Sequence, residues 1–536
     1  MIFNPLEEYE SKYKQLHYEN TRAFLDELIA KAQVNADENR KTVKNYVDLQ
    51  ANRKKLQSIL NWLLFFRVLA FITILLIPVA IWVLTPKIKA LRQEIDGADK
   101  QIADLLALAW KQMNPLNRLF SDRDALTIIE KTLPDIQFAP SFTVEQELDM
   151  SVNYDFSSSA SDTDHSTLDV LSGTYNENPF LFETRLVHKM GMETYHGYKT
   201  IHWTSSVVIN GKRMTQHHSQ TLHATVTKPK PFYSTQFLLH YCAQSGPDLS
   251  FTRDATHLDL KSDKALERYV KRGEKKLKRK TDKAIKQNQD FVSMSNTDFE
   301  VLFDAIDRDH EVQFRTLFTP LAQTNMVDLI RSQSGYGDDF DFIKRKRTNR
   351  IITKHSQGRN VNLLAASYRS YDYDAVYQNF LEKNARFFKE VYFDFAPLWA
   401  IPSYQERPVH SLKPIPDHTQ QYSIRECETL SNLINEKDLA HPNSQTRAII
   451  KSSFIESKNG IDEIGIDAYS YDIAKQTDFV TLLGGDGRLH TVHVPWDEYL
   501  PLQTNHRFFV APTEQAKNRT VLATRNNLCI FNHSNT

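Results

Sequence analysis

The stretch "VLAFITILLIPVAIWVL" (residues 68–84) contains no charged side chain, although the chain on both sides of it is polar. Between Trp62 and Leu84 the one charge is Arg67, which lies near one end and can reach the lipid headgroups. A membrane-spanning helix needs about 20 mainly apolar residues. The long polar segment before the stretch argues against a signal peptide. We therefore expect a single transmembrane helix here, rather than a core helix of a soluble domain.

The ends of this predicted span carry the residue types that anchor a helix in lipid. Trp62 and Trp82 lie near the two ends, where aromatic rings favour the interface. The basic residues on the two sides are almost balanced, with a small excess on the amino side that favours an inside amino terminus. We expect a single-pass protein of the cell membrane, with its orientation left open. The residues assigned to the span are Val68, Phe71, Leu75, Pro78 and Trp82.

A regular apolar stripe follows Pro86, with its side chains alternately three and four residues apart. This is the spacing of a coiled-coil seam, and three heptads are about the minimum for that assignment. The helix either pairs with a second copy of the chain, giving a homo-oligomer, or packs on the protein's own soluble part. The residues assigned to helix pairing are Ile88, Leu91, Ile95, Ile102 and Leu105.

Composition and cysteine usage exclude several classes of protein. Lys plus Arg equals Asp plus Glu at 66 each, so no overall field attracts nucleic acid, and we expect no such partner. Only 15 of 536 residues are glycine, and no phosphate-binding glycine motif occurs, so we expect no cofactor. The three cysteines lie far apart and indicate neither a disulfide framework nor a zinc knuckle. Their spacing leaves a Cys427 nucleophile with a distant histidine open, without supporting it.

From about residue 141 the sequence becomes rich in β-branched and aromatic residues. "TIHWTSSVVINGKRMTQHHSQTLHATVTKP" (residues 200–229) alternates like two strands around Asn210 and Gly211, the pair that a tight hairpin turn favours. His217 and His223 share one face of the second strand and are weak candidates for metal ligands. No carboxylate or cysteine at ligand spacing accompanies them, so surface histidines are the preferred interpretation. A second hairpin is predicted to turn between Gly484 and Gly487.

Residues 260–290 form a segment dominated by Lys and Arg with interleaved acids, which favours a solvated helix over one that contacts lipid or nucleic acid. His310 and Glu311 begin like a zinc-protease motif, but Phe314 occupies the position of its second histidine. "GYGDDF" (residues 335–340) is similar to a polymerase metal hairpin, and a turn is preferred because no second aspartate can be named.

Two segments carry a family resemblance. An "FEVLF" start (residues 299–303) is followed by an acidic turn and "LFTPLAQTNMVDLI" (residues 317–330), and "YFDFAPLWAIPSYQ" spans residues 392–405. They resemble an uncharacterised family of bacterial membrane-anchored proteins, of the mollicute and lactobacillus type, that contains a domain of unknown function. The resemblance implies a membrane anchor and no catalytic residue. Where the broader family has two spans, this chain has one apolar stretch.

These observations predict an α+β protein with a helical amino-terminal arm, a single transmembrane helix and a large soluble portion of antiparallel hairpins and helices. We expect a membrane-anchored scaffold or binding protein whose partners are the lipid bilayer and other proteins. The alternatives are a membrane-bound hydrolase with scattered acids and histidines, and a receptor-like module that binds a ligand. The expected parts are a helical arm (1–58), the transmembrane helix (59–85), a heptad helix with linker (86–139), a β-rich domain (140–258), a charged and helical segment (259–365) and an α+β domain (366–536).

Overall fold

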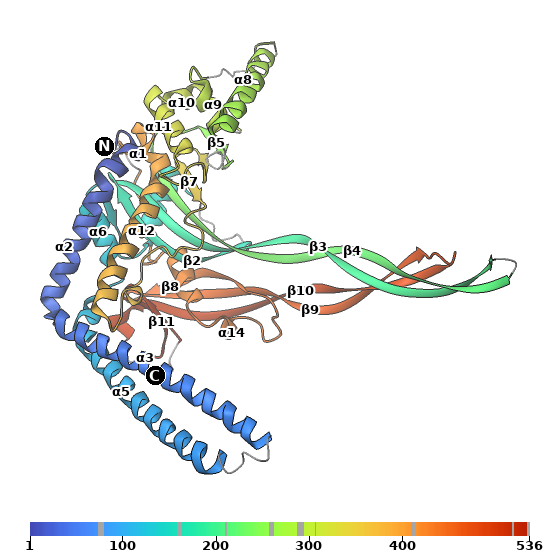
Figure 1. The fold of residues 1–536 in the computed structure, drawn as a ribbon. Coiled ribbons are helices and arrows are strands. Elements are labelled where there is room, and N and C mark those ends of the chain that lie inside the picture. Colours follow the sequence, from blue (N-terminus) through green and yellow to red (C-terminus); the bar gives the residue numbers. More distant parts are fainter. Residues whose placement is uncertain are drawn as a thin grey trace. The chain divides into compact units, whose positions relative to one another are not determined.

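The computed structural model describes residues 1–72, 80–157, 163–209, 212–256, 262–286, 294–305, 307–408, 413–516 and 519–532. The chain forms two compact units, each built from segments that are distant in the sequence. The helical unit comprises Leu6–Ile136 and Asn362–Phe393. The sheet unit comprises Met1–Pro5, Gln137–Val361 and Asp394–Thr536. The units therefore do not follow one another along the chain, as a linear series of domains would (Figure 1).

Long helices build the helical unit, and an apolar core joins four of them. The elements of the unit are α1 (Pro5–Glu8), η1 (Tyr9–Tyr13), α2 (Lys14–Ala32), α3 (Ala36–Ile72), η3 (Ala80–Leu84), α5 (Thr85–Leu119), α6 (Asp124–Thr132), η5 (Ala365–Ser367) and most of α12 (Tyr373–Trp399). The core joins Leu25 of α2, Leu116 of α5, Ile128 of α6 and Phe380 of α12. Helices that precede residues 68–84 are thus packed on helices that follow them.

Helices α3 and α5 lie side by side and antiparallel, and we call this pair the helical hairpin (Figure 1). Leu60 of α3 shares a buried cluster with Ile88 and Ile95 of α5, and Leu91 packs against the same cluster. The first half of the predicted heptad stripe therefore packs within the chain, against α3 and not against the expected soluble portion. Ile102 and Leu105 lie further along α5 and are half-buried. Pairing with a second copy stays a prediction.

Two antiparallel sheets build the sheet unit. The seven-stranded sheet has the order β1-β2-β3-β4-β7-β6-β5, and the five-stranded sheet has the order β11-β12-β10-β9-β8. The strands are β1 (Ile136–Phe138), β2 (His165–Tyr175), β3 (Asn178–Ile209), β4 (Lys212–Cys242), β5 (Ser250–Arg253), β6 (Phe340–Arg345), β7 (Thr348–Thr353), β8 (Ile449–Lys458), β9 (Ile461–Leu483), β10 (Leu489–Pro512), β11 (Val521–Arg525) and β12 (Leu528–Phe531). The remaining elements are α7 (Val144–Tyr154), α8 (Asp263–Lys286), α9 (Thr297–Phe303), α10 (Glu311–Leu317), α11 (Pro320–Arg331), η6 (Pro402–Gln405), α13 (Ile424–Asn432), α14 (Glu436–Leu439) and η7 (Thr513–Ala516).

Strands β3 and β4 pair over almost their whole length and form a ribbon that extends well beyond the sheet (Figure 1). Strands β9 and β10 form a second ribbon, whose turn is closed by the Gly484 carbonyl accepting from the Gly487 N–H at 3.0 Å. The sequence predicted both hairpins. Asn210 and Gly211 themselves lie outside the described residues, and Ile209 pairs with Lys212 on either side of them. We call the two ribbons together the ribbon arm.

The predicted α+β class is confirmed, with long amino-terminal helices and two antiparallel sheets. Among the residues that the structure describes, no helix combines the length and the apolar character that a membrane crossing requires. Of the residues assigned to the span, Leu75 and Pro78 lie outside the described residues, as does the side chain of Phe71. Val68 and Trp82 are described and are exposed. The single transmembrane helix stays a prediction.

Candidate functional site: the ribbon arm and a buried ion network

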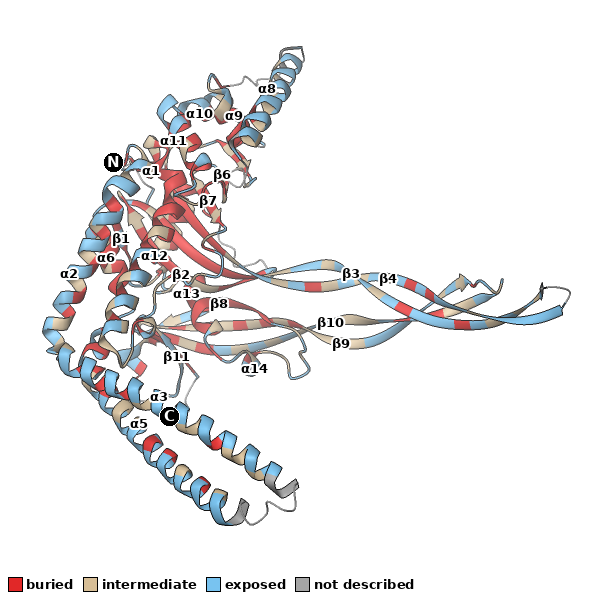
Figure 2. Cartoon of the chain, in the orientation of Figure 1, coloured by how far each residue is buried: buried red, intermediate tan, exposed pale blue. Residues whose placement is uncertain are grey.

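The two ribbons of the arm are held together face to face. Ile201 and Leu222 of the first ribbon share a buried cluster with Val492 and Val494 of the second. At Gly197 the backbones approach so closely that a Cβ would lie 2.2 Å from the His493 carbonyl oxygen. The alternation of buried and exposed residues along β3 and β4 follows from this contact, because successive side chains of a strand point to opposite faces (Figure 2).

A polar cluster fixes the two ribbons nearer the sheets. Lys228 of β4 forms an ion pair with Asp478 of β9 at 2.7 Å, and its ammonium lies 4.1 Å from the Trp496 ring centroid. The indole N–H of Trp496 donates to the same carboxylate at 2.8 Å. These three side chains, from β4, β9 and β10, fix the position of the first ribbon against the second. The arm is stabilised by apolar contacts and by this cluster.

The outer face is the face of the first ribbon on the side opposite to the second ribbon. Its side chains between Thr194 and Ser206 and between Thr215 and Thr227 are all exposed, and none of them is Asp, Glu, Lys or Arg. At about 3.3 Å per residue it is roughly 40 Å long. Such a surface can contact a partner through hydroxyl and imidazole groups without desolvating a charge. The outer face comprises Thr194, His196, Tyr198, Thr200, His202, Thr204, Ser206, Thr215, His217, Ser219, Thr221, His223, Thr225 and Thr227.

Both predicted metal candidates lie on this outer face. His223 Nε2 is 2.9 Å from His196 Nδ1, so His223 is bonded to another imidazole rather than to His217. Within the described part of the chain, no three His, Cys, Asp or Glu side chains lie close enough together to hold a metal ion. The structure thus places His217 and His223 on an exposed surface, as the sequence favoured, and does not join them in a site.

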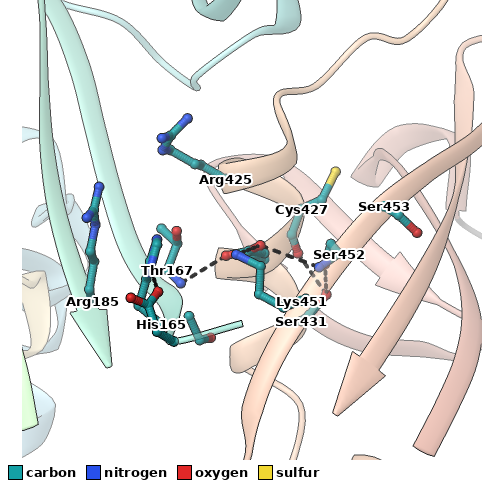
Figure 3. A network of polar contacts seen from close by, with 12 residues as sticks. His165, Thr167, Arg185, Arg425, Cys427, Ser431, Lys451, Ser452 and Ser453 are labelled. Atoms are coloured by element: carbon teal, nitrogen blue, oxygen red, sulfur yellow. Dashed lines mark hydrogen bonds and ion pairs between the residues drawn. The ribbon is translucent and has the colours of Figure 1, made fainter. Parts of the chain in front are cut away.

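In the sheet unit, a buried network of ions joins the two sheets through α13 (Figure 3). At its centre is the Glu183 carboxylate of β3, which is fully buried. It accepts hydrogen bonds from Arg185 at 2.8 Å and from Thr167 at 2.9 Å, and it lies 3.6 Å from the Arg425 guanidinium of α13. His240 of β4 contacts the same carboxylate at 3.1 Å. Strands and helix therefore converge on one negative charge.

The second carboxylate of the network belongs to Glu428 of α13 and faces the other sheet. Glu428 pairs with Lys451 of β8 at 2.7 Å and accepts the Thr167 backbone N–H of β2 at 3.0 Å. Figure 3 shows Thr167 on one side of α13 and Lys451 with Ser452 on the other. Glu428 thus bridges the seven-stranded and five-stranded sheets. Because the Glu428 and Lys451 charges are paired with each other, this bridge is compatible with its burial.

The electrostatics of this network indicate a structural role. Burial raises the pKa of the Glu183 carboxyl, but Arg185 and Arg425 outweigh burial and hold that pKa well below its usual range. Burial lowers the pKa of His240 to about 3, so this imidazole is neutral at physiological pH. Burial also raises the pKa of the Cys427 thiol well above its usual value. A nucleophilic cysteine needs a lowered pKa and some exposure, so Cys427 does not fit that role.

Among the described residues of the sheet unit, two of the clefts have no histidine in their lining. The first, of about 310 Å³, lies against α8 and α9 and is lined by Arg272, Lys276, Glu300 and Asp304, among others. The second, of about 240 Å³, is lined by Glu145 and other residues of α7 and β2. A hydrolase of the predicted type would bring acids and histidines together in one cleft. These two clefts give that alternative no support.

Comparison with protein-family models, with curated proteins and with solved structures finds no match to this chain. The resemblance to bacterial membrane-anchored proteins therefore stays an expectation. Sequence reasoning identified the ribbon residues but missed the ion network. One signal was present, because Glu183 and Arg185 interrupt the apolar strand "FLFETRL" at alternate positions and so face the same way. Their partners on α13, Arg425 and Glu428, show no comparable pattern in the sequence.

Proposed function

We propose that this protein is a membrane-anchored scaffold or binding protein, in which the end of the helical hairpin inserts into lipid and the ribbon arm contacts a partner. Support for the anchor comes from the exposed side chains near residues 68–84. Trp62 is 60%, Val68 61% and Trp82 81% exposed. Fully burying one such side chain gains about 1.5–3 kcal/mol, so a few of them suffice for binding a bilayer.

Exposed apolar side chains gather on α3 and carry the proposal, because the rings of Trp62, Phe65 and Phe66 contact one another. Ile59 and Leu69 of α3 are exposed as well, and Val83 is exposed on η3. A core helix of a soluble unit would cover these side chains, and here the described residues leave them open. Contiguous apolar patches of this kind mark membrane or protein contacts.

Basic side chains support a lipid partner over a protein partner for this surface. Lys54 and Lys55 of α3 and Lys87, Lys89 and Arg92 of α5 are exposed next to the apolar region. Each basic residue near an anionic membrane surface contributes about 1 kcal/mol of attraction. Apolar insertion and electrostatic attraction together give two membrane signals, and stable anchoring of a peripheral protein usually needs two.

Flotation with lipid vesicles tests the anchor. The purified full chain is mixed with vesicles of phosphatidylcholine and phosphatidylglycerol and centrifuged through a density gradient. We expect the protein to float, and the triple variant Phe65→Ser, Val68→Ser, Trp82→Ser to remain in the dense fraction. The matched control is Val47→Ser with Leu108→Ser, which removes exposed apolar side chains from the same two helices away from the tip. Failure of the unaltered chain to float would contradict the proposal.

The outer face of the ribbon arm supports the second half of the proposal. It is long, exposed and uncharged, and the second ribbon stiffens it from behind. A stiff surface loses little conformational entropy on binding, which favours affinity. Crosslinking from a photoreactive residue at Thr200 tests it, with the same residue at Lys475 of the other ribbon as the control. We expect partner adducts from position 200 and far fewer from position 475.

A further inference from the structure

Residues that precede the apolar stretch contact residues that follow it. These contacts restrict the membrane topology of the stretch. In the helical unit, the His17 ring of α2 stacks on Phe388 of α12 with centroids 3.9 Å apart. Arg40 of α3 forms an ion pair with Asp374 of α12 at 2.8 Å. In both pairs, one residue precedes residues 62–84 in the chain and the other follows them. A helix crossing once would place the two members of each pair on opposite sides of a hydrocarbon layer about 30 Å thick.

The sheet unit contains an independent contact of the same kind. The backbone N–H of Ile2 donates to the Gln405 side-chain oxygen at 2.7 Å, and the Gln405 amide donates back to the Ile2 carbonyl at 2.7 Å. Ile2 precedes the apolar stretch and Gln405 follows it. Two units, each by its own contacts, therefore require the chain on both sides of the stretch to lie in one compartment.

We infer that the helical hairpin dips into one leaflet and returns to the side it came from, so that the protein is anchored without crossing the membrane. This inference rests on the proposed membrane anchor and specifies its topology. Two complete crossings would need roughly 40 apolar residues, and the 62–84 stretch holds about half of that. One crossing is incompatible with the contacts of both units. A shallow hairpin satisfies both the length and the contacts.

The dimensions of the hairpin fit one leaflet. The ion pair of Arg53 with Asp99 and the cluster of Leu60 with Ile88 set the register of the two helices. In this register Trp62 lies at the level of Lys87 and Lys89, where the basic side chains can meet headgroups. From Trp62 to the end of α3 at Ile72 the helix rises roughly 16 Å. This is close to half of the roughly 30 Å hydrocarbon core.

Cysteine labelling of the full chain in bacterial spheroplasts tests the inference. Ser58→Cys lies before the apolar stretch and Lys100→Cys after it, and both positions are exposed. The unaltered chain is the matched control, because Cys242, Cys427 and Cys529 are buried. A membrane-impermeant maleimide is applied before and after permeabilisation, with labelling in detergent as the reference. We expect the two variants to behave alike, both labelled before permeabilisation or both only after it.

The outcomes separate the inference from the anchor on which it rests. If one variant is labelled before permeabilisation and the other only after it, the chain crosses the membrane. The one-leaflet topology is then wrong, while the anchor stands. If the unaltered chain is absent from the membrane fraction, the anchor fails and the topology fails with it. Equal labelling of both variants in a membrane-bound chain supports both.

Discussion

The Arg53 guanidinium of α3 donates to the Asp99 carboxylate of α5 at 2.9 Å, across the two helices that flank the apolar stretch. Both side chains are about one-third to one-half exposed, and exposed ion pairs contribute at most about 1 kcal/mol to stability. The pair therefore helps to fix the register of the hairpin, and the buried Leu60, Ile88 and Ile95 supply most of its stability.

A substitution in the buried cluster of the hairpin should therefore lower its stability much more than a substitution in the exposed ion pair. Ile95→Asp places a charge in the buried cluster. Removing such a side chain alone costs about 2–5 kcal/mol, so we expect this substitution to destabilise the hairpin by about that much or more. Arg53→Ala should cost much less, because solvent screens an exposed ion pair. Gln93→Asp, at an exposed position two residues away, is the control. Hydrogen exchange of α3 and α5 measures the effect, and equal protection in Ile95→Asp and the control would contradict the packing.

The ion network predicts that Glu183 cannot lose its charge without a large loss of stability. Glu183→Gln leaves the Arg185 and Arg425 guanidiniums buried without their shared counter-ion. Breaking a buried pair by removing one partner costs about 3–5 kcal/mol. Glu193→Gln, on the same strand but partly exposed and paired with Lys230 at 3.6 Å, should cost under about 1 kcal/mol. Urea unfolding compares the two, and similar midpoints would show that the network is not stabilising.

Local patterns of the sequence predicted the elements but not their neighbours. Strand-like runs around Asn210 and Gly211 indicated the first hairpin, and the glycines between 484 and 487 indicated the second, because these signals depend on residues close in the chain. The contact of the ribbons joins Lys199 to the Thr491 carbonyl, 292 residues away, and no local pattern carries that information. The heptad stripe likewise required an apolar partner without naming it. The structure supplies α3 as that partner for Ile88 and Ile95.

The two faces of the first ribbon predict opposite responses to the same substitution. Ile201 is buried against Val492 and Val494, so Ile201→Lys should separate the ribbons and lower stability by about 2–5 kcal/mol. The preceding residue, Thr200, lies on the exposed outer face, so Thr200→Lys should change stability by about 0.5 kcal/mol or less. Thermal unfolding and limited proteolysis of the arm measure both. A larger effect at Thr200 than at Ile201 would reverse the assignment of faces.

A buried histidine of the sheet unit predicts how stability changes at alkaline pH. Burial lowers the pKa of His355, but hydrogen bonds to Asp339 at 2.6 Å and to Asp394 outweigh burial and raise that pKa to about 9. Tyr336 stacks on the ring with centroids 3.7 Å apart. The charged imidazolium, paired with two carboxylates, is therefore the form that the folded protein stabilises.

The sign of the effect follows from proton binding in the two states. Between the unfolded pKa of about 6.5 and the folded pKa of about 9, the folded chain holds a proton that the unfolded chain has lost. The stabilisation is complete below about pH 6.5 and is lost as the pH rises to about 9, by about 3 kcal/mol at 1.36 kcal/mol per pKa unit. Urea unfolding at several pH values measures this slope. His355→Gln should remove it, and His217→Gln, on the exposed outer face, should leave it unchanged. Burial lowers the pKa of Lys344 to about 7, which gives a slope of opposite sign in the same window, so the test is the difference between the unaltered chain and His355→Gln. The same pH dependence from pH 6.5 to pH 9 in both chains would show that His355 does not hold its proton in the folded state.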